Sequence, residues 1–369
     1  MTRPALILCL DGCGPEYLDA SDTPNMDTMA KAGWKTNGHA VFPTVTNVNN
    51  TSILTGTFPA IHGITSNFFF DAGLGLGVYM ESAEYIQTPT VFERLRKQGL
   101  SSAFLTSKEK LRTLLSRGAV VSISAENPPA WLVHLIGPPP DIYSVEVNLW
   151  LMEASLAVMG NYPDVAFAYV STTDYVMHTY PCDHSESQRH LHEIDKLLGR
   201  FVNQFGDCDI AITADHGINA KTIGLNPAKI LMDVGIDAEV VPVIKDRHIV
   251  HHGNCAGAAY VHLRQIENLS GAQQCLEEVS EIDTVLTRQE AVVEHHLYPD
   301  RIGDLVLLAD SQTVFGEFPS ARTEVKVRSH GSLHEAIVPI IGYGSRLSTA
   351  RPYYSKELVN ILLPPGGTG

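Results

Sequence analysis

Short apolar runs alternate with helix-like stretches through the first half of the chain. Apolar runs bounded by turn residues predict buried strands at residues 5–10, 102–106, 165–170, 209–213 and 338–341. Between them, Thr23 and Pro24 predict the start of a helix that ends near Gly33, and a long amphipathic stretch predicts another helix over 185–205. Strands that alternate with helices predict an α/β fold with a doubly wound, mostly parallel sheet.

Residues 221–328 show a different pattern, with shorter units and more valine. Strands are predicted at 239–244, 258–263 and 305–308. We interpret this stretch as a smaller α+β cap insertion. Residues 1–220 together with 329–369 then form the catalytic core.

Composition narrows the function classes. Of the 369 residues, 44% are hydrophobic and 18% charged, which is typical of a globular chain with a sizeable core. The 26 Lys and Arg against 41 Asp and Glu give a net charge of −15, which disfavours nucleic acid and anionic membranes as partners. No apolar run approaches the length of a membrane span, and six cysteines without CxxC pairs indicate reduced thiols in a cytoplasmic protein. The oligomeric state does not follow from the sequence.

Three carboxylates share one position relative to the predicted strands. Asp11, Asp174 and Asp215 each follow a strand directly or after a few small residues. In an open α/β sheet the ligand crevice lies beyond the carboxyl ends of the strands. We therefore expect the three to converge at one edge, where they need cations.

Histidines accompany these carboxylates. His178 lies four residues after the second carboxylate, a spacing that places both side chains on one face of a helical turn. His216 directly follows the third, and His330 precedes the last predicted strand, with His334 as the competing candidate. Mixed Asp and His ligation suits zinc, with manganese or iron as possible substitutes. Any one of these residues could be an ordinary turn residue, but the set favours a metal site.

A candidate nucleophile lies in the segment Phe-Pro-Thr-Val-Thr-Asn-Val-Asn-Asn at 42–50. Pro43 ends an extended stretch, and Thr46 could cap the helix that follows. A helix N-terminus favours a phosphoryl group, and a threonine hydroxyl becomes a nucleophile when a base or metal lowers its pKa. A structural N-cap is the alternative, and the metal cluster favours the nucleophile.

Several motifs in order then carry a resemblance: Leu-Asp-Gly, Thr-Pro-Asn-Met, Phe-Pro-Thr-x-Thr, Ile-His-Gly-Ile, Asp-x-x-x-His and Ala-Asp-His-Gly. The chain resembles the alkaline phosphatase superfamily, in its nucleotide pyrophosphatase/phosphodiesterase branch, from Asp11 to His330. Within that branch, residues 44–50 and 106–112 are similar to the phosphonoacetate hydrolases.

The resemblance implies two zinc ions per chain. Asp11, Asp215 and His216 would hold one, with Thr46 as the nucleophile beside it. The other would be held by Asp174, His178 and His330, which is preferred over His334 because the family histidine is followed by glycine.

The resemblance also implies substrate contacts. Asn67 matches the family asparagine that contacts a phosphoryl oxygen. Lys108 and Lys110 match the lysines that bind the substrate carboxylate in phosphonoacetate hydrolases. Without the resemblance, Asn67 would be read as a turn residue and the lysines as a solvated helix start.

The implied activity is two-zinc hydrolysis of the C–P bond of phosphonoacetate, a small anionic phosphonate. It would give acetate and phosphate through a phospho-threonine intermediate at Thr46. A nucleotide pyrophosphatase or phosphodiesterase with the same metal site is the alternative, and residues 68–70 (Phe-Phe-Phe) could then stack on a base or simply pack in the core. Sulfatase is disfavoured because no cysteine lies in a Cys-x-Pro-x-Arg pattern. His251 and His252 are expected in the cap, at the surface or facing the cleft.

Overall fold

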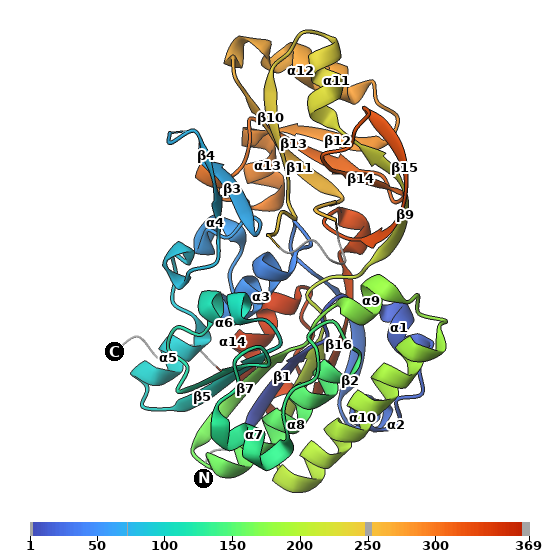
Figure 1. The fold of residues 1–369 in the computed structure, drawn as a ribbon. Helices are drawn as coiled ribbons and strands as arrows, with labels where there is room; N and C mark the ends of the chain where they lie inside the picture. Colours follow the sequence, from blue (N-terminus) through green and yellow to red (C-terminus); the bar gives the residue numbers. More distant parts are fainter. Residues whose placement is uncertain (1–2, 72, 248–252, 364–369) are drawn as a thin grey trace.

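A seven-stranded sheet forms the centre of the larger lobe (Figure 1). The computed structural model describes residues 3–71, 73–247 and 253–363. The strands lie in the order β2 (Trp34–His39), β16 (Ile337–Tyr343), β8 (Asp209–Thr213), β1 (Ala5–Cys9), β7 (Val165–Ser171), β5 (Ser101–Thr106) and β6 (Val121–Ser124).

Six of these strands run in one direction, and β16 runs against its neighbours β8 and β2. The mostly parallel α/β sheet is therefore confirmed. The predicted strand at 338–341 is antiparallel, because the chain returns from the second lobe at the carboxyl edge and must run away from it. The order places the carboxyl ends of β8, β1 and β7 side by side, where Asp215, Asp11 and Asp174 follow them.

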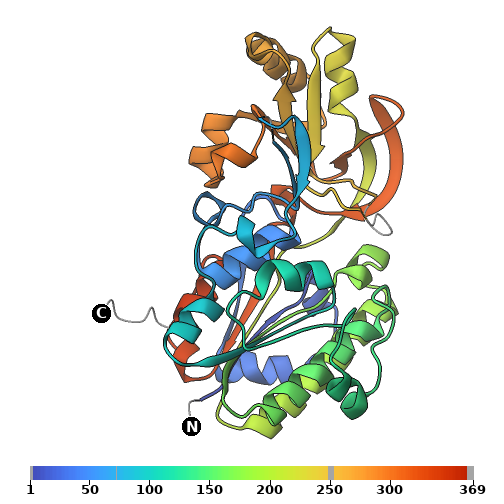
Figure 2. The ribbon, with the colours of Figure 1, turned by 60° about the vertical axis from the view of Figure 1, so that its left-hand side comes forward.

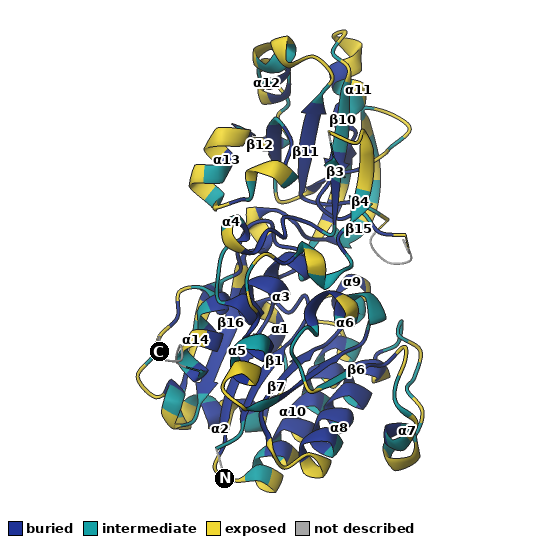
Figure 3. Ribbon diagram, turned by 90° about the vertical axis from the view of Figure 1, so that its left-hand side faces the viewer, coloured by how far each residue is buried: buried dark blue, intermediate teal, exposed yellow. Residues whose placement is uncertain are grey.

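Helices cover both faces of this sheet, as the alternation of β1 shows. Ala5, Ile7 and Cys9 belong to one core cluster, and Leu6 and Leu8 belong to the other, all fully buried. Because successive side chains of a strand point to opposite faces, a strand buried on both sides is apolar throughout. In Figure 3 the strands of the sheet are buried, and exposed positions gather on the outer faces of the helices.

The helices of the larger lobe have the following bounds: α1 Pro15–Asp19, α2 Pro24–Ala32, α3 Thr46–Thr55, α4 Pro59–His62, α5 Val91–Lys97, α6 Glu109–Leu115, α7 Ala130–Ile136, α8 Glu146–Asn161, α9 Tyr175–Thr179, α10 Ser185–Phe205 and α14 Leu358–Leu362. The predicted helices at 24–33 and 185–205 correspond to α2 and α10. None of the helices in the described ranges has the combination of length and apolar character that a bilayer crossing requires.

The second lobe contains two further sheets (Figures 1 and 2). One has the order β10 (Ala238–Pro242), β11 (Ala258–Leu263), β13 (Leu305–Ala309) and β12 (Ile282–Thr287). The other has the order β14 (Thr313–Phe315), β9 (Asn219–Leu225) and β15 (Arg322–Ser329). The helices of this lobe are α11 (Pro227–Asp233), α12 (Leu269–Glu277) and α13 (Arg288–His295). The three strands predicted here match β10, β11 and β13, whereas β9, β12, β14 and β15 were not predicted.

The chain enters and leaves this lobe through two paired strands. β9 and β15 are antiparallel, and Asn219 lies opposite Ser329 in their register. The hairpin of β3 (Phe68–Asp71) and β4 (Leu76–Tyr79) packs on the second lobe although it comes early in the chain. Its Phe70 ring lies 5.2 Å from that of His262, centroid to centroid. The division into a core and a cap at 220/221 and 328/329 stays a prediction.

Candidate active site

The turn after β1 brings two of the predicted carboxylates together. The backbone N–H of Asp11 donates to Thr172 Oγ1 at 2.9 Å, and that of Gly12 donates to Asp215 Oδ1 at 3.2 Å. Gly12 has φ +72°, and a Cβ there would lie 2.8 Å from Ile218 Cδ1, so this tight turn favours glycine. Asp11 is therefore held against the loops that follow the two neighbouring strands.

Asp11, Asp215 and His216 form one compact group that could hold a metal ion. His216 Nε2 lies 3.5 Å from Asp11 Oδ1 and 3.6 Å from Asp215 Oδ2, and all three side chains are buried. The Thr46 hydroxyl lies 3.3 Å from the same Nε2. The structure thus brings together Thr46, the predicted nucleophile, and the three residues that the resemblance implies as ligands of one zinc ion.

The second predicted ligand set also converges. His178 Nε2 lies 2.9 Å from Asp174 Oδ2, and His330 Nε2 lies 3.8 Å from the same oxygen. Ligand atoms of Asp174, His330 and His216 all lie within 4.8 Å of one another. His178 completes the surroundings of Asp174 from the next turn of α9. The pairing of each ligand with one ion stays a prediction.

Each of these three histidines uses its Nδ1 on a backbone carbonyl. Nδ1 of His178 lies 2.6 Å from Arg328 O, and Nδ1 of His330 lies 2.7 Å from Thr44 O. Nδ1 of His216 lies 3.1 Å from Gly217 O. A carbonyl can only accept, so Nδ1 carries the proton and Nε2 presents a lone pair to the carboxylates. This is the arrangement that orients a histidine for a metal.

The Asp11 carboxylate is buried without a full set of hydrogen-bond partners among the described residues. Asp11 Oδ1 is buried and has no hydrogen-bond partner among the described residues. Burial raises the pKa of Asp11 well above its usual range, and the neighbouring Asp215 and Asp174 raise it further. Lys108 Nζ lies 3.8 Å from Asp174 Oδ1. A buried site of three carboxylates and three imidazole nitrogens fits divalent cations, and its oxygen and nitrogen donors suit zinc.

Thr46 is the first residue of α3, not its N-cap. Val45 occupies the cap position in extended conformation, and no side chain caps this helix. The capping role considered for Thr46 is therefore wrong, because its hydroxyl points to His216 instead of back to the helix. At this position Thr46 lies at the positive end of the helix dipole, which favours an anionic group beside it.

The sequence missed Asn50 as a supporting residue of this helix. Its side-chain NH₂ donates to Asp215 Oδ2 at 3.1 Å and to the Thr46 carbonyl at 3.0 Å. The Tyr169 hydroxyl donates to Asn50 Oδ1 at 2.7 Å. Asn50 thereby ties the helix of Thr46 to a candidate ligand and to strand β7. Its position four residues after Thr46 was a signal that helix geometry could have used.

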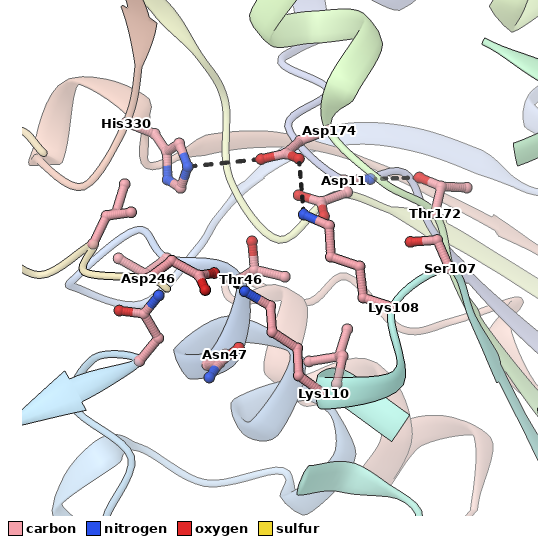
Figure 4. A pocket seen from close by; sticks show the side chains of 14 residues that line it. Asp11, Thr46, Asn47, Ser107, Lys108, Lys110, Thr172, Asp174, Asp246 and His330 are labelled. Carbon is pink, nitrogen blue, oxygen red and sulfur yellow. Dashed lines mark hydrogen bonds and ion pairs between the residues drawn. The ribbon is translucent and has the colours of Figure 1, made fainter. Parts of the chain in front are cut away.

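Both predicted lysines face the same pocket (Figure 4). Lys108 is the N-cap residue of α6, and Lys110 lies in its first turn. Lys110 forms an ion pair with Asp246, from the segment after β10. Burial, with a contribution from Lys108, lowers the pKa of Lys110 to about 8. The sequence had not singled out Asp246, because nothing in its neighbourhood marks it as more than a loop residue.

The remaining candidates divide by position. Asn67 lines the pocket, and its Oδ1 accepts from the Lys245 backbone N–H at 2.9 Å, which leaves the amide NH₂ as its donor. His334 lies instead at the surface, where it pairs with Asp283 at 2.8 Å. His251 and His252 lie outside the described residues.

The side chains around the pocket come from both lobes, as Figure 4 shows for those that it labels. The lining residues are Asp11, Val45, Thr46, Asn47, Asn67, Ser107, Lys108, Lys110, Leu111, Thr172, Asp174, Ile244, Asp246 and His330.

The fold and this site together place the chain in the alkaline phosphatase superfamily. The chain belongs to the type I phosphodiesterase/nucleotide pyrophosphatase family, whose model matches residues 5–333. This family is metal-dependent, and the two Asp/His groups could hold the metal.

Curated relatives match part of their own length. A venom phosphodiesterase of Naja atra is 26% identical over 231 residues, which are 59% of this chain and 26% of that protein. An ectonucleotide pyrophosphatase/phosphodiesterase of Caenorhabditis elegans is 23% identical over 348 residues, 89% of this chain and 41% of that protein. The chain thus spans about a quarter of the length of the venom enzyme.

A much fuller match comes from a solved structure. Phosphonoacetate hydrolase from Sinorhizobium meliloti 1021, in complex with phosphonoformate, is 29% identical, with a TM-score of 0.88 over 98% of this chain and 94% of that chain. The same enzyme was also solved with phosphonoacetate. Murine ectonucleotide pyrophosphatase/phosphodiesterase 5 shares the fold, with a TM-score of 0.67 at 16% identity over 98% of this chain and 94% of that chain.

Proposed function

We propose that this protein is a phosphonoacetate hydrolase that cleaves a C–P bond with two zinc ions. The observation that carries the proposal is the position of Lys108 and Lys110, which line the same pocket as Thr46. The candidate ligands Asp11, Asp174 and His330 line that pocket too. A phosphodiester offers no carboxylate for such a pair. The similarity over nearly the whole chain to a phosphonoacetate hydrolase supports the same substrate.

Asp11, Asp215 and His216 would hold one zinc ion, and Asp174, His178 and His330 the other. Bound there, the ions would neutralise phosphonyl charge and lower the pKa of the Thr46 hydroxyl. The free N–H groups at the start of α3 and the Asn67 amide would orient the phosphonyl oxygens. The protein's own groups would thus fix phosphorus opposite the Thr46 hydroxyl.

The Thr46 hydroxyl would lose its proton to water as Oγ1 attacks phosphorus, and the C–P bond would break with its electron pair on the acetate carbon. The charge spreads onto the carboxylate, where Lys108 and Lys110 stabilise it, and the carbon then takes a proton to give acetate. Water would hydrolyse phospho-Thr46 and release phosphate. The lysines would thus act on the leaving group and Thr46 on phosphorus.

Substrate comparison tests this proposal. Phosphate release from phosphonoacetate by the zinc-loaded protein is measured beside cleavage of a nitrophenyl phosphodiester and a nucleotide pyrophosphate. We expect phosphonoacetate to be the best substrate. The double variant Lys108→Ala/Lys110→Ala should lose phosphonoacetate turnover and keep any diesterase activity, since Thr46 and the metal ligands are untouched.

A nucleotide pyrophosphatase or phosphodiesterase with the same metal site is the second candidate, and the family match favours it. The aromatic run does not help this candidate. Phe68 and Phe69 are buried, and the rings of Phe68 and Tyr79 pack edge to face at 5.0 Å. Diester cleavage without phosphonoacetate turnover would establish this alternative.

The six free thiols support the cytoplasmic location that we also propose.

A further inference from the structure

The ion pair between Lys110 and Asp246 joins the two lobes across the pocket. Lys110 comes from α6 of the larger lobe, and Asp246 comes from the segment that connects β10 to β11. Figure 4 shows the two charged groups facing each other with Thr46 close by. The side chain of Asp246 is only 5% exposed. Lys110 therefore already has a carboxylate partner inside the substrate pocket.

The backbone of Asp246 is held by contacts that do not involve its carboxylate. Its N–H donates to Asn254 Oδ1 at 2.8 Å, and its carbonyl accepts from Asn254 Nδ2 at 3.2 Å. The preceding residue, Lys245, donates its N–H to Asn67 and pairs with Glu317 at 3.0 Å. Exchange of the Asp246 carboxylate for an amide leaves these backbone contacts available.

The charges around Lys110 determine how much its ammonium depends on the ion pair with Asp246. Lys108 repels the Lys110 ammonium, and Glu81, Glu126 and Asp174 attract it through space. A largely buried ammonium is costly without a counter-ion. In the free protein Asp246 supplies that counter-ion at contact distance.

We propose that Asp246 competes with the substrate's carboxylate for Lys110 and so determines how strongly the site selects carboxylated phosphonates. This inference rests on the proposed function, because it assigns to Lys110 the role of carboxylate receptor. A carboxylated phosphonate exchanges one carboxylate for another, so Lys110 stays paired throughout. A phosphonate without a carboxylate leaves Asp246 on Lys110 and gains nothing there.

The same exchange acts in reverse after the reaction. Acetate is the product that retains the carboxylate, and Asp246 competes with it for the lysine. Asp246 therefore promotes acetate release at the expense of some substrate affinity. A site without Asp246 would bind both the substrate and the product more tightly.

Binding of two ligands that differ in the carboxylate tests the proposal. Affinities for phosphonoacetate and for methylphosphonate are measured by calorimetry on the zinc-loaded protein, with Thr46→Ala in every sample to prevent turnover. In Asp246→Asn we expect the preference for phosphonoacetate over methylphosphonate to rise about tenfold, because the competing charge is gone. The matched control Glu317→Gln removes an ion pair from the same segment outside the pocket and should leave the preference unchanged.

Other outcomes overturn the proposal. A preference that falls in Asp246→Asn would mean that Asp246 orients Lys110 for the substrate. An unchanged preference would mean that Asp246 acts only on packing. In a Lys110→Met background, Asp246→Asn should no longer change the preference, and a persistent effect would also contradict the proposal.

Product inhibition gives a second readout in the active protein with Thr46 intact. Acetate should inhibit Asp246→Asn about tenfold more strongly than the unsubstituted protein. Asp246→Ser serves as the second variant if the asparagine variant folds poorly. The proposed function is tested separately by turnover of phosphonoacetate, so binding that follows these expectations without turnover would refute the hydrolase and leave the role of Asp246 standing.

Discussion

The imidazole rings of His216 and His330 lie stacked, with 3.6 Å between their centroids and 12° between their planes. One residue precedes the excursion of the chain into the second lobe, and the other follows it. Burial and the adjacent His216 and His178 lower the pKa of His330 well below its usual value. The lowered pKa of His330 favours the neutral form of its ring, which is the form that binds metal. The stack is thus a consequence of where the chain leaves and rejoins the larger lobe.

Replacement of Thr46 tests whether its hydroxyl is the nucleophile. Thr46→Ala should lower kcat at least about a thousandfold, because it removes the hydroxyl that lies beside His216. Thr46→Ser keeps a hydroxyl and should retain part of the activity. Steady-state phosphate release gives the rates, and mass spectrometry of acid-quenched protein detects the phosphorylated residue. Full activity in Thr46→Ala would refute the nucleophile assignment.

Asp11→Asn should have opposite effects with and without metal. The folded-state pKa of Asp11 is raised, so the metal-free protein binds more protons than the unfolded chain and loses stability as pH rises above about 4. Asp11→Asn removes this penalty and should raise the melting temperature of the chelated protein at pH 7.5. In the presence of zinc the same variant should melt below the unsubstituted protein, because it loses a ligand. Thermal melts at pH 5.5 and 7.5 check both signs, and equal shifts with and without metal would contradict the expectation.

His62 predicts an acid-sensitive contribution to stability. Burial lowers its pKa to about 3, with Arg301 adding to the shift, and its Nε2 lies 2.8 Å from Ser52 Oγ. Because the unfolded histidine is protonated below about 6.5 and the folded one is not, stability present at neutral pH is lost as pH falls through that window. At pH 5 this loss is about 2 kcal/mol.

The destabilisation caused by His62→Gln should therefore shrink by about 2 kcal/mol between pH 7.5 and pH 5. Urea denaturation of both proteins, in the same metal state, measures the difference at each pH. A difference that stays constant with pH would show that His62 titrates normally.

Removal of one partner of the buried ion pair between Lys221 and Glu335 should strongly destabilise the folded protein. Both side chains are fully buried and lie 2.8 Å apart. Glu335 also accepts from Asn219, and its carbonyl accepts from Gly217, next to His216. Glu335→Leu should destabilise by about 3–5 kcal/mol, because it strands the Lys221 ammonium.

The double variant Lys221→Met/Glu335→Leu should recover much of that loss. Urea midpoints of the two single variants and the double variant give the coupling energy. Glu193→Gln, which removes the surface pair with Lys196, is the control and should leave the midpoint unchanged. Additive losses in the double variant would mean that the two residues do not act as a pair.

The sequence alone located most of the fold, because buried parallel strands are apolar throughout. The apolar run at 5–10 shows this for β1. Because parallel strands end at the same edge of the sheet, the aspartates that follow them could then be predicted to converge there. Strands with mixed polarity were not predicted. β2 and β15 expose alternate positions and carry polar side chains, so no apolar run marks them. The direction of β16 depends on where the chain returns from the second lobe, which local pattern does not encode.

In the candidate site, too, some residues could be predicted from the sequence and others could not. Asp11, Thr46 and Asp215 follow from motif and position along the strands. Asp246 could not be found from the sequence, because its relation to Lys110 depends on how the second lobe lies over the first. Contacts between lobes are a property of tertiary packing.

The pairing of Asn219 with Ser329 has a consequence for how such proteins diversify. A segment whose two ends lie side by side can be lengthened, shortened or exchanged as a cassette without stretching the chain that anchors it. The residues of the Asp/His groups lie outside the segment from Asn219 to Ser329, whereas Asp246 lies within it. On the proposed function, grafting a related second lobe at this strand pair would therefore change which leaving group is accepted, while Thr46 and the Asp/His groups stay with the larger lobe.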